Sequence, residues 1–266
     1  MNLGKRIRLN RIFAHPSGRL CSVAVDHFMG YQRDLPTGLQ HMQSTLGEIM
    51  AARPDAVTMH KGIATSCWEP YAGQVPLIIQ ASLIRPDDSC FEFAVTPEEV
   101  LNLGADAFAV AAFVRGASEA KYLRAVADFV RQSAQIELPL ICHIYPRYVD
   151  DPPRISYEPE DIAWAVHCAS EVGADVVKVP YCGDVAAHAQ IVADCPVPVV
   201  AAGGPKTSTQ EEALAMMADV VRSGARGATI GRNIWGFDNV TASVNAFKAV
   251  IHDGCSASEA MHRAGL

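Results

Sequence analysis

The chain alternates along its whole length between short apolar runs and longer stretches with a helical pattern. The apolar runs are rich in Val, Ile and Ala and are bounded by Gly, Pro or Asp, which is typical of buried β-strands. We expect eight such strands, at residues 20–26, 55–60, 76–82, 106–112, 138–145, 175–179, 197–202 and 226–230. Each is followed by enough chain for a crossover helix, so the pattern predicts successive βαβ units and a parallel sheet.

The helical pattern fills the segments between these strands. We expect helices near residues 39–52, 118–134, 184–193, 239–252 and 256–264, a short helical stretch after Lys61-Gly62, and further helices that begin at Thr96, Glu158 and Ser208. Two of them begin with a capping-box spacing, Thr96 with Glu99 and Ser208 with Glu211. These signals place a helix between each pair of successive strands.

Eight β/α units in one chain predict a single-domain α/β fold, the (β/α)8 TIM barrel, over residues 1–266. A basic segment precedes the first strand, and an extra helix follows the last unit. No linker or low-complexity run divides the chain. An open doubly wound sheet is the alternative, but no strand is followed by the glycine-rich fingerprint of a dinucleotide site.

Composition narrows the function classes. Half of the 266 residues are hydrophobic, and 22 Lys and Arg stand against 29 Asp and Glu, for a formal net charge of −7. This acidic balance argues against nucleic-acid or anionic-membrane partners. No apolar run approaches the ~20 residues of a membrane span, and the basic N-terminus lacks the apolar core of a signal peptide. The eight scattered cysteines include no C-x-x-C pair, which indicates reduced thiols. We therefore expect a cytoplasmic protein, and we expect it to be a homo-oligomer.

A lysine lies within the strand predicted at residues 175–179. Side chains alternate along a strand, so if Val177 and Val179 face the helices, then Val176 and Lys178 face the barrel interior. Lysine is almost never buried without a partner or a purpose. A lysine amine withdrawn from water can act as a nucleophile towards a carbonyl carbon. The alternatives are that Lys178 reaches out of the strand end to solvent, or pairs with a carboxylate.

Other strands also carry polar side chains at inward positions near their C-terminal ends, where the chemistry of these barrels takes place. They are Asp26, His60, Gln80, Ser82, His143 and Tyr145. Each alone could be a satisfied core polar group, and a buried neutral imidazole needs only one good partner. The convergence of Asp26, Tyr145 and Lys178 on one rim favours catalysis.

The loops after the last two strands indicate a phosphate site. Gly203-Gly204-Pro-Lys206 follows the seventh strand and allows an anion to approach backbone N–H groups. Gly231-Arg232 follows the eighth strand and adds a guanidinium at the start of a short helix. The loops after strands seven and eight are a recurrent phosphate site of such barrels, so we expect a phosphorylated ligand.

Five motifs together resemble a known family. They are Asp26-His27, Tyr145-Pro-Arg147, Asp175-Val-Val-Lys178-Val-Pro-Tyr181-Cys-Gly-Asp184, Ala202-Gly-Gly-Pro-Lys206 and Gly231-Arg-Asn-Ile-Trp235. Over nearly its whole length the chain resembles the archaeal-type class I fructose-bisphosphate aldolases, which are DeoC/LacD-like. That group also includes an autoinducer-2 phosphate thiolase and an aminodideoxyheptulosonate synthase.

The resemblance implies roles for individual residues. It implies a Schiff-base lysine at Lys178, a proton-transferring Tyr145 and a supporting carboxylate at Asp26. It also implies a phosphate site, formed by Gly203, Gly204, Lys206, Gly231 and Arg232. We expect a further set of residues to bind substrate: His27, His60, Ser82, His143 and Arg147.

Two positions depart from the family pattern. The family commonly has glycine where this chain has Phe28 and Tyr148. Bulkier side chains at the mouth would reshape the pocket and change the choice of partner substrate.

These residues predict a class I aldolase that cleaves or forms a C–C bond in a phosphorylated keto sugar or related keto-phosphate. It would need no cofactor and no metal, since the lysine iminium polarises the substrate. The rival within the family is a thiolase-type or transaldolase-type carbonyl transfer on a phosphorylated diketone. A rival from another class is an FMN-dependent oxidoreductase, which would hold its phosphate at the same loops. A non-catalytic sugar-phosphate binding protein is a third.

Overall fold

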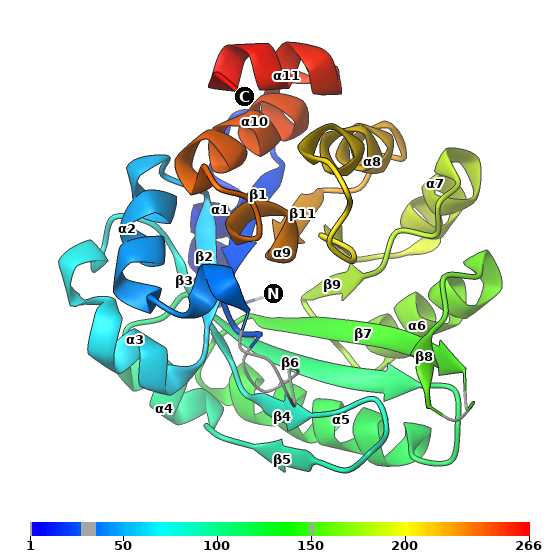
Figure 1. Cartoon of the computed structure of the whole chain (residues 1–266). Helices are drawn as coiled ribbons and strands as arrows, with labels where there is room; N and C mark the ends of the chain where they lie inside the picture. The colour runs from blue at the N-terminus through cyan, green and yellow to red at the C-terminus, as the bar shows by residue number, and fades with distance from the viewer. Residues whose placement is uncertain (1, 28–35, 149, 151) are drawn as a thin grey trace.

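Eight parallel strands close into a barrel in the computed structural model, which describes residues 2–27, 36–148, 150 and 152–266. The strands are β1 (Leu20–Ala24), β2 (Ala56–Met59), β3 (Leu77–Gln80), β6 (Ala107–Val114), β7 (Leu140–Tyr148), β9 (Val176–Val179), β10 (Val199–Ala202) and β11 (Gly227–Ile230). Their order around the barrel is β6-β3-β2-β1-β11-β10-β9-β7, and pairing of β6 with β7 closes it (Figure 1). The predicted (β/α)8 barrel is confirmed.

Helices surround the strands, as Figure 1 shows. They are α2 (Met42–Ala51), α3 (Lys61–Cys67), α4 (Pro97–Asn102), α5 (Glu119–Gln135), α6 (Pro159–Glu171), α7 (Val185–Asp194), α8 (Gln210–Arg222), α10 (Val240–Asp253) and α11 (Ala257–Ala264). Short helices η2 (Thr37–Leu39), η3 (Glu69–Tyr71) and α9 (Arg232–Trp235) lie in loops. In the described part of the chain, no helix is both long enough and apolar enough to cross a membrane.

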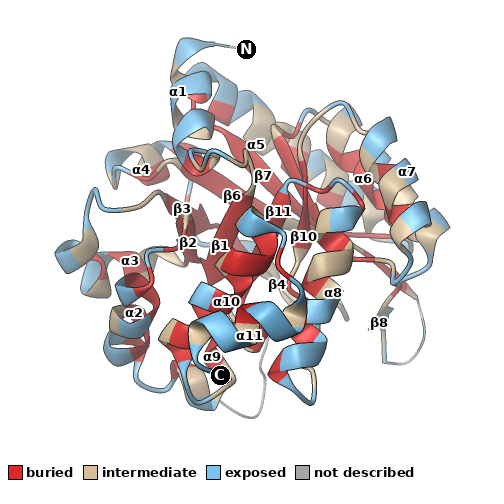
Figure 2. Ribbon diagram, turned by 90° about the horizontal axis from the view of Figure 1, so that it is seen from above, coloured by how far each residue is buried: buried red, intermediate tan, exposed pale blue. Residues whose placement is uncertain are grey.

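The alternation along each strand divides the core into two layers. Val177 and Val179 belong to the large cluster that packs against the helices. Val176 belongs to the separate inner cluster, with Ile78 and Ile141. Figure 2 shows the buried residues gathered in the strands and on the inner faces of the helices. The predicted inward and outward positions are therefore confirmed for these strands.

The basic N-terminal segment forms α1 (Leu3–Ile12), which closes one end of the barrel. Ile12 is fully buried and joins the inner cluster beside Leu20, at the start of β1. Lys5 Nζ lies 2.7 Å from Asp175 Oδ2, and both side chains are largely buried. Because α1 covers the N-terminal ends of the strands, a ligand must enter at their C-terminal ends.

Two connecting segments contain short strands that the sequence pattern did not predict as separate elements. The segment after β3 forms an antiparallel pair, β4 (Ser82–Ile84) with β5 (Phe91–Phe93). Strand β7 runs on to Tyr148 and pairs with β8 (Arg154–Ile155). The strands β4, β5 and β8 have only two or three residues each and pair only locally, so the sequence carries little pattern for them.

One predicted helix start is shifted by a residue. The capping box of α8 consists of Thr209 and Glu212, not Ser208 and Glu211. Ser208 and Thr209 are adjacent and either can cap, so spacing alone did not separate them. The capping box of Thr96 with Glu99 is confirmed.

All eight cysteines are free thiols, as predicted. Four of them, Cys21, Cys142, Cys168 and Cys255, are buried, and the other four are partly exposed. Burial raises the pKa of Cys142 to about 12, so this thiol stays protonated and acts as an apolar core group.

Candidate active site

A cavity with two lobes opens at the C-terminal ends of the strands. The first lobe is lined by Ala24, Pro180, Ala202, Gly203, Gly204, Thr229, Gly231 and Tyr157. The second is lined by Asp26, His60, Gln80, Ser82, Ile84, Pro86, Ala111, Phe113 and His143. Five residues line both lobes: His27, Tyr145, Ile155, Lys178 and Arg232. The arrangement therefore offers two neighbouring binding spaces with one amine at their junction.

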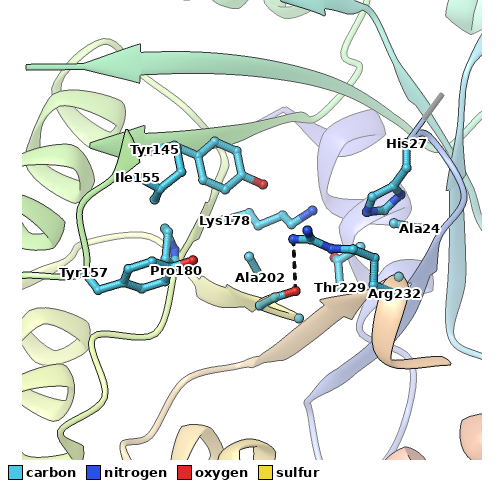
Figure 3. A pocket seen from close by; sticks show the side chains of 13 residues that line it. Ala24, His27, Tyr145, Ile155, Tyr157, Lys178, Pro180, Ala202, Thr229 and Arg232 are labelled. Carbon is cyan, nitrogen blue, oxygen red and sulfur yellow. Dashed lines mark hydrogen bonds between the residues drawn. The ribbon is translucent and has the colours of Figure 1, made fainter. Parts of the chain in front are cut away.

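Lys178 is the third residue of β9 and is only 5% exposed. Figure 3 shows its side chain extended into the cavity, with Tyr145, Arg232 and His27 around it. Among the described residues, none hydrogen-bonds or ion-pairs with the Lys178 amine, so the predicted alternative of a pair with a carboxylate is not observed there. The side chain lies in the cavity, so the alternative in which Lys178 reaches out of the strand end to solvent is not observed either. The amine is buried, unengaged and aimed at the space where a ligand would lie.

Tyr145 comes from the neighbouring strand β7 and is partly buried. Its phenol points into the cavity on the side of Lys178 (Figure 3). Its ring lies 6.2 Å from that of Phe113, at a tilt of 43°. A second phenol, from Tyr157, lies at the other side of the first lobe, and burial raises its pKa. The cavity thus holds two phenols within one space.

Asp26 follows β1 and is the carboxylate of the second lobe. Burial alone would raise its pKa, but His27, Lys178 and other neighbouring side chains outweigh this and lower it to about 2. Burial lowers the pKa of His27, whose Nδ1 lies 3.5 Å from Asp26 Oδ1, to about 4. At neutral pH the cavity therefore presents an ionised carboxylate beside a neutral imidazole.

The loops after β10 and β11 are tied together in the first lobe. Arg232 Nη2 donates to the carbonyl of Gly204 at 3.2 Å, the bond dashed in Figure 3. Buried Asn233 donates from Nδ2 to the carbonyls of Gly203 at 2.8 Å and Pro205 at 2.9 Å. No carboxylate in the described part of the chain pairs with Arg232. The guanidinium is therefore held in place while most of its donors remain available to an anion.

One expectation about the glycines is wrong. The N–H of Gly203 is not free for a ligand, because it donates to the carbonyl of Thr229 at 3.0 Å. The N–H groups of Gly204 and Gly231 have no acceptor among the residues that the structure describes. Gly203 and Gly231 are also needed for packing: a Cβ on Gly203 would lie 2.8 Å from Ile230 Cα, and one on Gly231 2.4 Å from His27 Cε1. Packing alone therefore accounts for glycine at positions 203 and 231, whether or not a ligand binds there.

The structure places two predicted ligand-binding residues away from the cavity. Arg147 is 5% exposed, and its Nη2 lies 2.8 Å from Asp88 Oδ2, so it anchors the loop between β4 and β5. Lys206 lies with Nζ 3.8 Å from the centre of the Phe237 ring, outside both lobes. The alternation of side chains along a strand could not show these contacts, because Asp88 and Phe237 lie in other segments of the chain.

The departures from the family pattern have different outcomes. Tyr148 turns to Glu158, with Oη to Oε1 at 3.3 Å, and lines neither lobe. Phe28 lies outside the described residues. Tyr148 therefore does not reshape the described cavity.

Several lining residues were missed as site residues. Gln80 was predicted at an inward position of its strand but was given no role in the site, and Thr229 occupies an inward position on β11 that strand alternation could have found. Ile155 and Tyr157 gave no such signal, because β8 and the residues after it reach the cavity only through the pairing with β7.

Comparisons with known proteins agree with this geometry. The family model described as DeoC/LacD family aldolase matches residues 20–236. The chain belongs to the DeoC/LacD family of aldolases. This aldolase is 32% identical to the 2-amino-4,5-dihydroxy-6-oxo-7-(phosphonooxy)heptanoate synthase of Streptomyces griseus, over 98% of this chain and 95% of the relative. The family resemblance predicted from the motifs is confirmed.

Two solved structures share the fold and a substantial part of the sequence. An archaeal fructose 1,6-bisphosphate aldolase has a TM-score of 0.82 and 28% identity, with 94% of this chain and 100% of the other covered. A second archaeal structure, with its catalytic Lys covalently bound to the carbinolamine intermediate of the substrate, has a TM-score of 0.81 and 27% identity, covering 93% and 99%. The protein is thus an aldolase-type lyase, as predicted, rather than a flavin oxidoreductase or a non-catalytic binding protein.

Proposed function

We propose that this aldolase forms a Schiff base at Lys178 with a phosphorylated keto substrate and cleaves or forms a C–C bond next to it. The observation that carries the proposal is the buried, unengaged amine at the junction of the two lobes. The names of its relatives support it, since they include Schiff-base aldolases and a synthase of a phosphonooxy compound.

The chemistry uses three side chains. Lys178 adds to the ketone, water leaves, and the resulting iminium accepts the electron pair of the breaking C–C bond. Tyr145 takes the proton from the hydroxyl of the departing aldehyde in cleavage and returns it in synthesis. Asp26, ionised at neutral pH, balances the cationic iminium and orients a hydroxyl. In the cleavage direction an enamine and an aldehyde result, and protonation and hydrolysis of the enamine release the ketone and the amine.

The two lobes divide the substrate between them. The first lobe, with Arg232 and the Gly204 and Gly231 amides, would hold the phosphate of the ketone. Lys178 adjoins that lobe, so the phosphate would lie near the carbonyl, as in dihydroxyacetone phosphate. The second lobe would then receive the aldehyde part.

Removal of the guanidinium tests the phosphate site. We expect Arg232→Ala to raise KM for the phosphorylated ketose about ten- to a hundredfold, because charge-assisted hydrogen bonds of roughly 1.5–3 kcal/mol are lost. If the phosphate is held equally in the ground and transition states, kcat stays within a few-fold. Steady-state kinetics with phosphorylated and dephosphorylated ketose measure both.

The matched control is Arg131→Ala, which removes an exposed guanidinium paired only with Asp128 on the same helix. It should leave KM unchanged. Equal use of the dephosphorylated substrate by the wild type would contradict the phosphate site.

The proposed mechanism uses no metal, because the iminium supplies the positive charge that a metal would otherwise provide. We expect full activity after incubation with excess EDTA. A metal-dependent aldolase assayed in parallel should lose activity and serves as the control. Loss of activity that zinc restores would contradict the Schiff-base mechanism.

We also propose a cytoplasmic homo-oligomer. The eight free thiols support a reducing compartment. Size-exclusion chromatography with light scattering measures the oligomeric state, and a strictly monomeric active enzyme would contradict that part of the proposal.

A further inference from the structure

Gln80, the last residue of β3, is a hub of the second lobe. It is 4% exposed, and its side chain and backbone contact four polar residues around it. The direction of each of these hydrogen bonds can be assigned, because the chemistry of each partner shows whether it donates or accepts.

The orientation of the Gln80 amide follows from a backbone donor. The N–H of Ser82 donates to Gln80 Oε1 at 3.0 Å, and a backbone N–H can only donate. The amide nitrogen must therefore lie on the other side, where Nε2 is 3.0 Å from His143 Nδ1 and 3.4 Å from Asp26 Oδ2. An amide NH₂ has two protons and no acceptor, so it donates one to each partner.

These contacts determine which ring nitrogen of His143 carries the proton. Nδ1 accepts from Gln80, so the proton of the neutral ring is on Nε2. Burial lowers the pKa of His143 well below its usual value, which agrees with a neutral ring. Among the described residues none accepts a hydrogen bond from the Nε2–H of His143, and the ring lines the second lobe.

His60 is held in the opposite way. Its Nδ1 lies 2.9 Å from the backbone carbonyl of Gln80, and a carbonyl can only accept. Nδ1 of His60 is therefore the donor, and in the uncharged form of the ring the lone pair is on Nε2. His60 lines the same lobe as His143.

We propose that Gln80 is a positioning residue that holds His143 and His60 in opposite tautomers, and that this pair recognises hydroxyl groups of the aldehyde in the second lobe. His143 offers an N–H donor and His60 an acceptor, and a hydroxyl group can use both. The part that concerns the aldehyde rests on the proposed function of the cavity. The tautomers themselves do not, since they are set by the protein alone.

The tautomers can be measured without substrate. In ¹⁵N-histidine-labelled wild-type enzyme at neutral pH, two-bond ¹H–¹⁵N correlation spectra should show His143 as the Nε2–H form and His60 as the Nδ1–H form. His143→Asn and His60→Asn samples assign the signals. A charged ring, or the same tautomer at both positions, would overturn the proposal.

Gln80→Glu tests the positioning role. The new carboxylate still accepts from the Ser82 N–H but cannot donate to His143 Nδ1, so His143 should move its proton to Nδ1 or become charged. Gln132→Glu, at an exposed position of α5, makes the same charge change and is the control. An unchanged His143 signal in folded Gln80→Glu would overturn the role of Gln80.

Aldehyde preference tests the recognition. In synthesis from dihydroxyacetone phosphate, the wild type should prefer glyceraldehyde over propanal, which lacks both hydroxyls, by about ten- to a hundredfold in kcat/KM. In Gln80→Glu this ratio should fall towards one, while Gln132→Glu keeps it. The same ratio in wild type and Gln80→Glu would overturn the recognition of hydroxyls.

Borohydride trapping separates the two hypotheses. Gln80→Glu with dihydroxyacetone phosphate alone should still give the reduced adduct on Lys178. Failure of the wild type to be trapped would count against the proposed function and leave the measured tautomers standing. Normal trapping together with unchanged tautomers and preference in Gln80→Glu would count against Gln80 alone.

Discussion

Lys178→Arg should lower kcat/KM by about 10⁵-fold or more, the scale on which a covalent nucleophile acts in other enzymes. Arginine keeps the positive charge near Asp26 but cannot form an imine with a ketone. The loss should therefore come from the missing covalent step rather than from a changed charge in the cavity. The measurement is steady-state cleavage of a phosphorylated ketose with detection of the three-carbon product.

Borohydride identifies the lysine directly. Reduction in the presence of a keto-phosphate should convert the iminium into a stable secondary amine on the peptide that contains Lys178. Lys121→Arg makes the same change at an exposed position of α5 and should keep both activity and labelling. If the label is found on Lys61 or Lys206, or if Lys178→Arg keeps turnover, Lys178 is not the nucleophile.

The second large effect is expected for Tyr145→Phe, which should lower turnover by roughly 10²–10⁴-fold, the usual contribution of a positioned acid or base. Phenylalanine keeps the ring and its packing beside Phe113, so only the proton-transferring hydroxyl is removed. Iminium formation at Lys178 precedes C–C cleavage, so borohydride trapping should persist. The combination of slow turnover with intact trapping distinguishes a proton-transfer role from a structural one.

Tyr71→Phe provides the matched control, because it removes a phenol hydroxyl from a short helix that lines neither lobe. It should leave turnover unchanged. The second phenol of the cavity, Tyr157, is the alternative proton donor. Near-normal turnover of Tyr145→Phe together with a large loss in Tyr157→Phe would transfer the role to Tyr157.

Period-two alternation was sufficient to predict the barrel and the direction of its side chains. Lys178 has apolar neighbours on both sides in β9, and the burial of Val177 and Val179 against the helices leaves the lysine only the interior. The same rule placed Asp26, His143 and Tyr145 at inward positions near one rim. These features are local, because they depend only on which side of a strand a residue faces.

The alternation rule does not predict contacts between segments that are far apart in the sequence. Arg147 matches the family motif, yet Asp88, from the loop between β4 and β5, holds it outside the cavity. Ile155 and Tyr157 reach the cavity because β8 pairs with the end of β7, and neither polar segment carries a strong strand pattern. Such partners are decided by the path of loops in space.

The sequence by itself determined the fold, the inward position of Lys178 and the family, since hydrophobic alternation and short motifs are read along the chain. Only the tertiary structure decided which groups at the strand ends are already hydrogen-bonded within the protein. It showed that the Gly203 N–H is used by Thr229, and that Gln80 faces His143, Asp26 and Ser82. A hydrogen bond needs two atoms within about 3 Å and in line, and for strands far apart in the sequence that geometry exists only once the barrel closes.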